Sequence, residues 1–191
     1  YRSSAASDVY KRQDYVRTTV SGPEEPHARE LLVADIDDDG TDELLSVQEA
    51  ATDEERKITT PTRIRAHRLS GDTFTAHTLA EFDDRQARFL VAGDLNHDGT
   101  TDLALGAMKS GLWLLTRTGS AWQPALIDAA SGGFEHVTRA ADLDGDGLLE
   151  LVVADDNAQE LMLYRYRAER GDFASTPVSY THLTLPTTYT V

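Results

Sequence analysis

The sequence contains no cysteine, so it can form neither disulfide bonds nor thiolate metal sites. Basic residues are also scarce: 18 Lys and Arg stand against 33 Asp and Glu, giving a net charge of −15. This balance argues against nucleic acid and anionic membrane surfaces as partners, because both are bound through basic patches. No apolar run approaches the roughly 20 residues of a membrane-spanning helix, so we expect no membrane insertion of this segment. The excess of carboxylates suits cations instead.

The two ends of the chain are related to each other at the DNA level. One DNA sequence encodes Ser3 to Gln13 (SSAASDVYKRQ), and its complementary strand, read in a different frame, encodes Val178 to Thr187 (VSYTHLTLPT). Unrelated protein termini should not share such a relation, and the DNA resembles a transposase-type sequencing adapter. We therefore expect residues 1–13 and 178–191 to be adapter-derived and to carry no fold information. The genuine polypeptide would be a fragment of a longer gene.

Three acidic loops of the form D-x-[DN]-x-D-G-x-x-[DE] recur between these ends. Loop 1 covers residues 35–43, loop 2 covers 94–102 and loop 3 covers 142–150. The starts of loops 1 and 2 are further apart in the chain than the starts of loops 2 and 3. The difference falls in the polar stretch 51–62, and a variable polar insertion of this kind belongs on a surface loop.

The segments around the loops repeat as well. Each loop lies between two short apolar runs, and an alternating segment and a turn follow. An aromatic residue also stands at the same distance before the start of each loop: Tyr15, Phe74 and Trp122. Short β-type runs separated by turn residues indicate strands. By this register, residues 14–20 form the last strand of a preceding repeat.

Four short strands in a unit of about 50 residues are typical of a β-propeller blade. We predict an all-β fold, a partial β-propeller of about three four-stranded blades plus the last strand of a preceding blade. The expected segments are 14–26 for that last strand, 27–82 for blade 1, 83–130 for blade 2 and 131–177 for blade 3. Because closed propellers have about four to eight blades, we expect open blade edges. An open β-solenoid is the alternative, but it would use shorter repeats.

The loops offer the ligands that calcium prefers, which are six to eight oxygens from carboxylates and backbone carbonyls. Positions 1, 3, 5 and 9 of each loop carry oxygen-bearing side chains, position 6 is glycine for a sharp turn, and position 7 would offer its carbonyl. The predicted ligands are Asp35, Asp37, Asp39, Thr41 and Glu43; Asp94, Asn96, Asp98, Thr100 and Asp102; and Asp142, Asp144, Asp146, Leu148 and Glu150. Since crowded carboxylates repel one another without a cation, we predict about three bound Ca²⁺, one in each loop.

The same opening pattern occurs in EF-hands, which need a bidentate Glu at position 12 and flanking helices. Position 12 is Ser46, Leu105 or Val153 here, and the flanks are strand-like, so an EF-hand is excluded. The loops could also be ordinary polar turns between strands. That interpretation is strongest for loop 2, where Asn96 lowers the negative charge.

The acidic loops and their flanking strands resemble the FG-GAP and VCBS repeats of integrin alpha-like β-propellers, over nearly all of residues 14–177. The resemblance implies that each loop joins the first two strands of a blade and binds calcium. It also implies an extracellular, periplasmic or cell-surface protein, where calcium is near millimolar and weak sites suffice. The insertion at 51–62 departs from the pattern and puts the geometry of blade 1 in doubt.

A few residues outside the loops could also carry chemistry. His97, at position 4 of loop 2, is expected to face solvent, and His67 and His77 are expected on strand surfaces. Trp113 and Trp122 are expected to pack in the core or between blades, with stacking on a sugar as the alternative. Residues 131–136 (SGGFEH) combine glycines with an aromatic and two titratable groups, and are expected to connect two blades.

The sequence favours a calcium-stabilised, non-catalytic module for extracellular binding, adhesion or scaffolding, with a polysaccharide or protein ligand. The alternative is the propeller part of a secreted polysaccharide-degrading enzyme, such as a lyase. That alternative requires titratable and basic groups to converge on the propeller axis. The candidates are His27, Arg88, His136 and Arg139.

Overall fold

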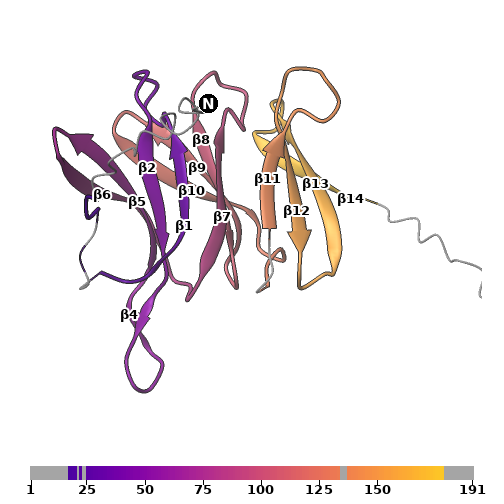
Figure 1. Cartoon of the computed structure of the whole chain (residues 1–191). Coiled ribbons are helices and arrows are strands. Elements are labelled where there is room, and N and C mark those ends of the chain that lie inside the picture. Colours follow the sequence, from indigo (N-terminus) through magenta and orange to yellow (C-terminus); the bar gives the residue numbers. More distant parts are fainter. Residues whose placement is uncertain (1–16, 21, 23–24, 134–136, 179–191) are drawn as a thin grey trace, which may run out of the picture.

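The computed structural model describes residues 17–20, 22, 25–133 and 137–178. Within these ranges the regular structure consists of strands alone, arranged as three four-stranded antiparallel sheets and one two-stranded hairpin (Figure 1). Blade 1 contains β1 (Ala28–Ala34), β2 (Glu43–Gln48), β5 (Thr62–Ser70) and β6 (Thr73–Phe82). Blade 2 contains β7 (Ala87–Gly93), β8 (Asp102–Ala107), β9 (Gly111–Thr118) and β10 (Ala121–Asp128). Blade 3 contains β11 (Val137–Ala141), β12 (Glu150–Asp155), β13 (Glu160–Arg167) and β14 (Asp172–Pro177).

Each four-stranded sheet is an antiparallel meander, and in blade 1 the β3–β4 hairpin is inserted between the paired strands β2 and β5. The first strands of the three blades contact one another, β1 with β7 and β7 with β11, so they form the inner side of the arc. The predicted partial β-propeller is therefore confirmed, with one sheet for each sequence repeat. The predicted last strand of a preceding blade lies partly outside the described residues, and residues 17–20 form no strand. That assignment stays a prediction, as does the adapter origin of residues 1–13 and 178–191.

The insertion in blade 1 forms its own small hairpin rather than disturbing the sheet. Strands β3 (Ala51–Thr52) and β4 (Ile58–Thr60) pair with each other, and residues 53–57 between them are exposed. The hairpin projects from the end of the sheets opposite the acidic loops (Figure 1). Blade 1 therefore keeps the same four-strand order as its neighbours.

The core lies between the blades and not inside any one of them. Alternate residues of a strand point to opposite faces, so Leu103 and Leu105 of β8 pack toward blade 1, whereas Ala104 packs toward blade 3. All six residues of β8 are buried as a result. Fully burying one leucine side chain contributes roughly 2 kcal/mol. A blade is thus stabilised mainly by the neighbours on its two faces.

The outer faces of blades 1 and 3 lack such a neighbour among the described residues. Position 2 of the acidic loops shows this, because Ile36 and Leu95 are 4% and 0% exposed, whereas Leu143 is 56% exposed. On the other side, Leu31 and Val33 of β1 are 64% and 61% exposed. Among the described residues, each of the two end blades therefore has a face that no other blade covers, as expected of an unclosed propeller.

Candidate metal centre

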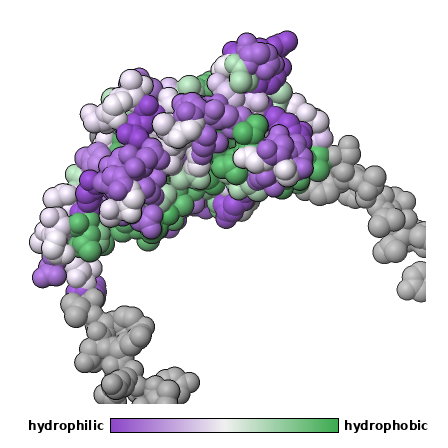
Figure 2. All heavy atoms as spheres, turned by 90° about the horizontal axis from the view of Figure 1, so that it is seen from above, coloured by the Kyte–Doolittle hydropathy of each residue, from purple (hydrophilic) through white to green (hydrophobic). Residues whose placement is uncertain are grey.

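The three acidic loops lie at one end of the sheets, each joining the first and second strands of its blade (Figure 1). Figure 2 looks onto this end, where hydrophilic side chains gather in separate clusters. A strand-to-strand connection needs a tight reversal, and the acidic side chains supply the acceptors that hold it.

The carboxylate at position 1 organises each loop by accepting backbone hydrogen bonds. In loop 1, Asp35 accepts from the backbone N–H of Asp39 (3.1 Å) and Gly40 (2.8 Å). Asp94 accepts from the same two positions of loop 2, both at 3.0 Å. In loop 3, Asp142 accepts from positions 4 and 6, at 2.7 and 3.0 Å. The loops are therefore wound tightly around their first carboxylate.

Two positions in each loop have left-handed backbone. The glycines at position 6 have φ of 85° in loops 1 and 2 and 89° in loop 3, as their residue type predicts. Position 4 is also left-handed, with φ of 59° at Asp38, 61° at His97 and 79° at Gly145. The sequence interpretation missed this second requirement, although the glycine at position 4 of loop 3 could have indicated it. A non-glycine residue in this region costs of order 1 kcal/mol or more, so the surrounding contacts must hold it.

The position-9 carboxylates are buried at the base of the loops. Glu43, Asp102 and Glu150 are only 2%, 0% and 4% exposed. Each accepts a hydrogen bond from the backbone N–H of position 2 of its own loop, at 3.3, 3.1 and 2.9 Å respectively. A buried carboxylate is costly unless it is paired. Glu43 bonds to Arg68 and Glu150 lies 3.6 Å from Arg165, so Asp102, which has no such partner, is the strongest sign of a missing cation.

Asp102 is the carboxylate that most clearly lacks a partner. One of its oxygens accepts from the backbone N–H of Leu95 and Asn96, both at 3.1 Å. The other, Oδ1, is buried with no hydrogen-bond partner. Burial, together with the nearby negative charges of Asp98 and Asp94, raises the pKa of Asp102 to about 6, although its backbone hydrogen bonds act in the opposite direction. A bound cation would supply the missing partner.

The remaining acidic side chains converge in loops 1 and 3. Carboxylate oxygens of Asp35, Asp37 and Asp39 all lie within 4.8 Å of one another, and the corresponding three Asp of loop 3 do the same. In loop 2 the side-chain amide of Asn96 donates to Asp98 at 3.0 Å. The donors are oxygens in each case, so the residues fit a hard cation such as Ca²⁺. Position 7 places its backbone N–H 2.9 Å from the position-5 carboxylate in all three loops.

Position 4 links each of the first two loops to the following blade. Asp38 of loop 1 accepts from Arg117 of β9 at 2.7 Å and from Thr101 at 2.9 Å. His97 of loop 2 makes an edge-on ring contact with Tyr166 of β13, with centroids 5.6 Å apart. The expectation that His97 faces solvent was therefore wrong, because a neighbouring blade covers it. A loop wound in the correct shape thus also joins two blades.

The other singled-out residues divide between the surface and the core. His77 is exposed, as predicted, but His67 is only 2% exposed and its Nε2 lies 2.8 Å from the Ser46 hydroxyl, so its predicted surface placement was wrong. Trp122 is buried and Trp113 packs edge-on against Phe82 at 5.4 Å, both in the core between blades 1 and 2. Residues 134–136 of the predicted blade connection, and with them His136, lie outside the described residues.

The inner strands carry some of the charged groups that an enzymatic alternative would need. Glu30 of β1 accepts a hydrogen bond from the backbone N–H of Phe89. Burial raises the pKa of Glu30, while Arg139 and Arg88 act to lower it. The guanidinium of Arg139 lies 5.6 Å from the ring centre of Phe89. His27 is exposed just before β1.

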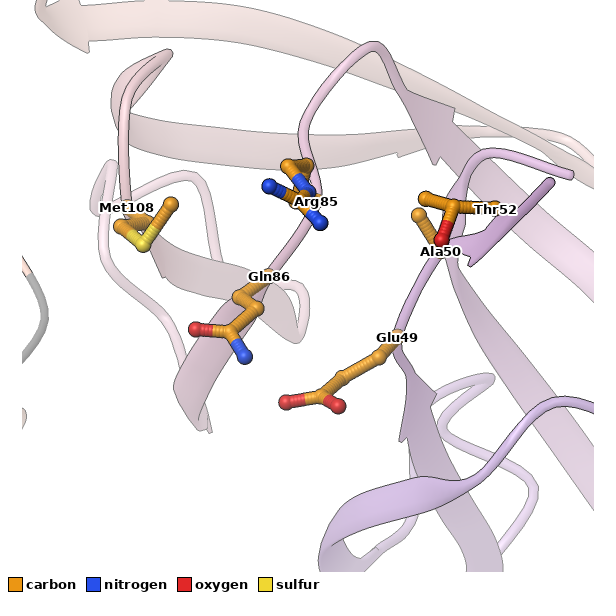
Figure 3. A pocket seen from close by; sticks show the side chains of 6 residues that line it. All are labelled: Glu49, Ala50, Thr52, Arg85, Gln86 and Met108. Carbon is orange, nitrogen blue, oxygen red and sulfur yellow. The ribbon is translucent and has the colours of Figure 1, made fainter. Parts of the chain in front are cut away.

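A hollow lies between blades 1 and 2 at the end opposite the loops. Figure 3 shows the side chains that line it, which are Glu49, Ala50, Thr52, Arg85, Gln86 and Met108. Backbone hydrogen bonds cross this region, from Ala50 to the carbonyl of Arg85 (3.1 Å) and from Met108 to that of Gln86 (3.0 Å). The hollow therefore sits where the chain passes from one blade to the next.

Repeated four-stranded sheets, each with an acidic loop between its first two strands, place the protein in a class: it is a segment of a β-propeller. Residues 87–122, from the start of β7 into β10, match the family model of the FG-GAP repeat. Integrin alpha-PS3 of Drosophila melanogaster is 33% identical over 103 residues, which cover 46% of this chain and 9% of that integrin. Blade 2 is therefore an FG-GAP repeat, and the predicted integrin-like character is confirmed. The chain spans only a small part of the length of this relative.

None of the described residues forms a helix with the length and apolar character that crossing a membrane requires.

Proposed function

We propose that this chain is a calcium-binding β-propeller repeat module without catalytic activity, part of an extracellular or cell-surface protein that binds or scaffolds other molecules. One observation carries the proposal: each of the three blades buries a loop carboxylate at position 9, and that of Asp102 leaves an oxygen with no hydrogen-bond partner. The adjoining loop side chains are all oxygen donors. Calcium is the cation that such a donor set prefers.

The ion would act as a structural element. An ion that binds the folded loop but not the unfolded chain stabilises the fold. The gain is about 2.7 kcal/mol of unfolding free energy when the free ion concentration is 100 times the dissociation constant. Position 4 of loops 1 and 2 contacts the next blade, so an ordered loop also supports the interface between blades. Loops of this kind suit a compartment with near-millimolar calcium, which supports an extracellular, periplasmic or cell-surface location.

The ligand of the module would be a protein or a polysaccharide. The likeness to an integrin alpha chain favours a protein partner. The net charge of −15 favours partners other than nucleic acid or anionic lipid.

A calorimetric calcium titration of the chelator-stripped chain, with a thermal melt at each end point, tests the proposal. We expect about three bound ions and a higher melting temperature with calcium. Asp142→Ala should remove one ion from the stoichiometry. Asp72→Ala, which removes an exposed carboxylate from the β5–β6 turn outside the loops, should leave the stoichiometry unchanged. A folded chain that binds no calcium would refute the proposal.

A catalytic propeller is the second candidate, and Glu30 is the observation in its favour. Its pKa is raised by burial, as a proton-transfer group requires, and Arg88 and Arg139 stand close enough to affect it. If the chain is a polysaccharide lyase, incubation with acidic polysaccharides should produce unsaturated sugar ends, and Glu30→Gln should abolish them. No unsaturated product from any acidic polysaccharide would leave the binding module as the function.

A further inference from the structure

The third strand of each blade places a different residue beside the base of the acidic loop. The nearest paired residues on the second and third strands are Leu44 with His67, Leu103 with Leu115, and Leu151 with Tyr164. One antiparallel step further, the residues that face the position-9 carboxylates of loops 1, 2 and 3 are Arg68, Thr116 and Arg165. These three positions are therefore equivalent, and two of them carry a permanent positive charge.

Arg68 reaches into the middle of loop 1. Its Nη2 lies 2.6 Å from Asp37 Oδ2 and 3.2 Å from Asp39 Oδ2, and it also bonds Glu43 Oε1. Its Nε donates to the same oxygen of Glu43 at 2.9 Å. A single guanidinium nitrogen thus touches carboxylates from positions 3, 5 and 9. These are three of the predicted ligands, so the nitrogen lies where a cation would be coordinated.

Arg165 takes up the same position in loop 3 at longer range. Its Nη2 lies 3.6 Å from Asp144 Oδ2, and its Nε lies 3.6 Å from Glu150 Oε1. Both distances are within ion-pair range but longer than a hydrogen bond. The arginine therefore lies at the rim of loop 3, beside carboxylates of positions 3 and 9.

Loop 2 differs both at the third-strand residue and at position 3 of the loop. Its third-strand residue is Thr116, which carries no charge, and its position 3 is Asn96 instead of Asp. Loops 1 and 3 each have four ligand carboxylates and one arginine, whereas loop 2 has three carboxylates and none, so all three clusters have a net charge of −3. Among the position-9 carboxylates only Asp102 has a buried oxygen without a hydrogen-bond partner, and its loop is the one that has no arginine; at position 3, Asp37 Oδ1 of loop 1 is also buried and unpartnered.

We propose that Arg68 and Arg165 are built-in competitors of the cation, so that calcium must displace an arginine to enter loops 1 and 3 but enters loop 2 freely. This inference rests on the proposed calcium function. When calcium is scarce, the arginine neutralises one of the four ligand carboxylates of its loop and so keeps the loop folded. Loop 2 lacks this substitute and depends on the ion itself.

The space around Arg68 supports its displacement. A hollow between blades 1 and 2 is lined by Arg68 together with exposed residues such as Thr75, His77 and Ser120. The Arg68 side chain is 45% exposed. A long flexible side chain at such a place can move from the carboxylates into the hollow without disturbing the core.

Exchanging the equivalent residues tests the inference by calcium titration of the full chain. Arg68→Thr and Arg165→Thr should each tighten one of the weaker sites about fivefold, because the arginine no longer competes with the ion for the loop carboxylates. Thr116→Arg should weaken the tightest site by a similar factor. Arg68→Lys keeps the charge and should resemble the wild type. Arg167→Thr removes a half-buried arginine that pairs with Asp172 outside the loops, and should leave all affinities unchanged.

The outcomes separate this inference from the proposed function. If the wild-type chain binds calcium but Arg68→Thr and Arg165→Thr bind it with unchanged or lower affinity, the competition is refuted and calcium binding stands. If neither the wild type nor any folded variant binds calcium, the proposed function fails as well. The strongest support would be that loop 1 binds no ion in the wild type and binds one in Arg68→Thr. Thermal melts without calcium show which variants are folded.

Discussion

Blades 2 and 3 have nearly the same strand plan and the same loop, yet their loops lie in different surroundings. Leu95 at position 2 of loop 2 is fully buried, whereas the equivalent Leu143 of loop 3 is 56% exposed. His97 at position 4 of loop 2 contacts Tyr166 of the following blade, while loop 3 has Gly145 there and no following blade among the described residues. The comparison teaches that a loop in this protein is completed by its neighbour as much as by its own sequence.

The largest expected effect comes from the buried leucine. Leu95→Ala should lower the free energy of unfolding by about 3 kcal/mol, because it leaves a cavity in the core between blades 2 and 3. Leu143→Ala should lower it by less than about 1 kcal/mol, because its side chain is largely exposed already. Denaturant unfolding of both variants measures the difference. Equal losses would show that the outer face of loop 3 is covered after all.

An intermediate effect is expected from removing one carboxylate at position 5. Asp98→Ala should lower the calcium-bound free energy of unfolding by about 2 kcal/mol, because it removes ligation and loosens the loop that contacts blade 3. Asp146→Ala, the equivalent change in loop 3, should lower the same free energy by about 1 kcal/mol, because no described blade packs against that loop. Melts with calcium and with chelator give both numbers. A larger cost for Asp146→Ala would contradict the comparison.

The smallest expected effect concerns the contact between loop 1 and blade 2. Arg117→Met removes an ion pair with Asp38 and a hydrogen bond to the carbonyl of Asp37, at 2.7 and 3.1 Å, both of which join loop 1 to blade 2. It should cost about 1 kcal/mol of unfolding free energy. Arg167→Met breaks a similarly exposed pair with Asp172 within blade 3, and should lower the melting temperature less, because no contact between blades is lost. Indistinguishable melting temperatures would mean that position 4 contributes nothing to the joining of blades.

Much of the fold could be predicted because the signal repeats. The loops, the apolar runs beside them and the turn residues recur in register, so strand number and order followed without any tertiary information. The sequence also placed Trp113 and Trp122 correctly between blades. His67 was misplaced because a histidine in an alternating strand is normally on the surface. Here a buried Ser46 hydroxyl lies within hydrogen-bond distance of it.

The candidate site was predictable in its members but not in its connections. A nine-residue acidic pattern identifies its own carboxylates, since they are close in the chain and wind around one centre. Nothing in that pattern indicates that Arg68 and Arg165 stand among them, because strand pairing brings these residues in from the third strand of each blade, well beyond the end of the loop. The contact of His97 with Tyr166 likewise joins residues of two different blades.

The sequence by itself determined the repeat, the all-β fold, the tight turn of each loop and the oxygen-rich set of candidate ligands. These are local properties, fixed by residue type and by spacing along one short segment. Only the tertiary structure decided which loop is covered, which carboxylate is buried without a partner, and which loop has an arginine beside it. Those features depend on strands and blades meeting across long sequence separations, and side-chain burial arises only when they pack.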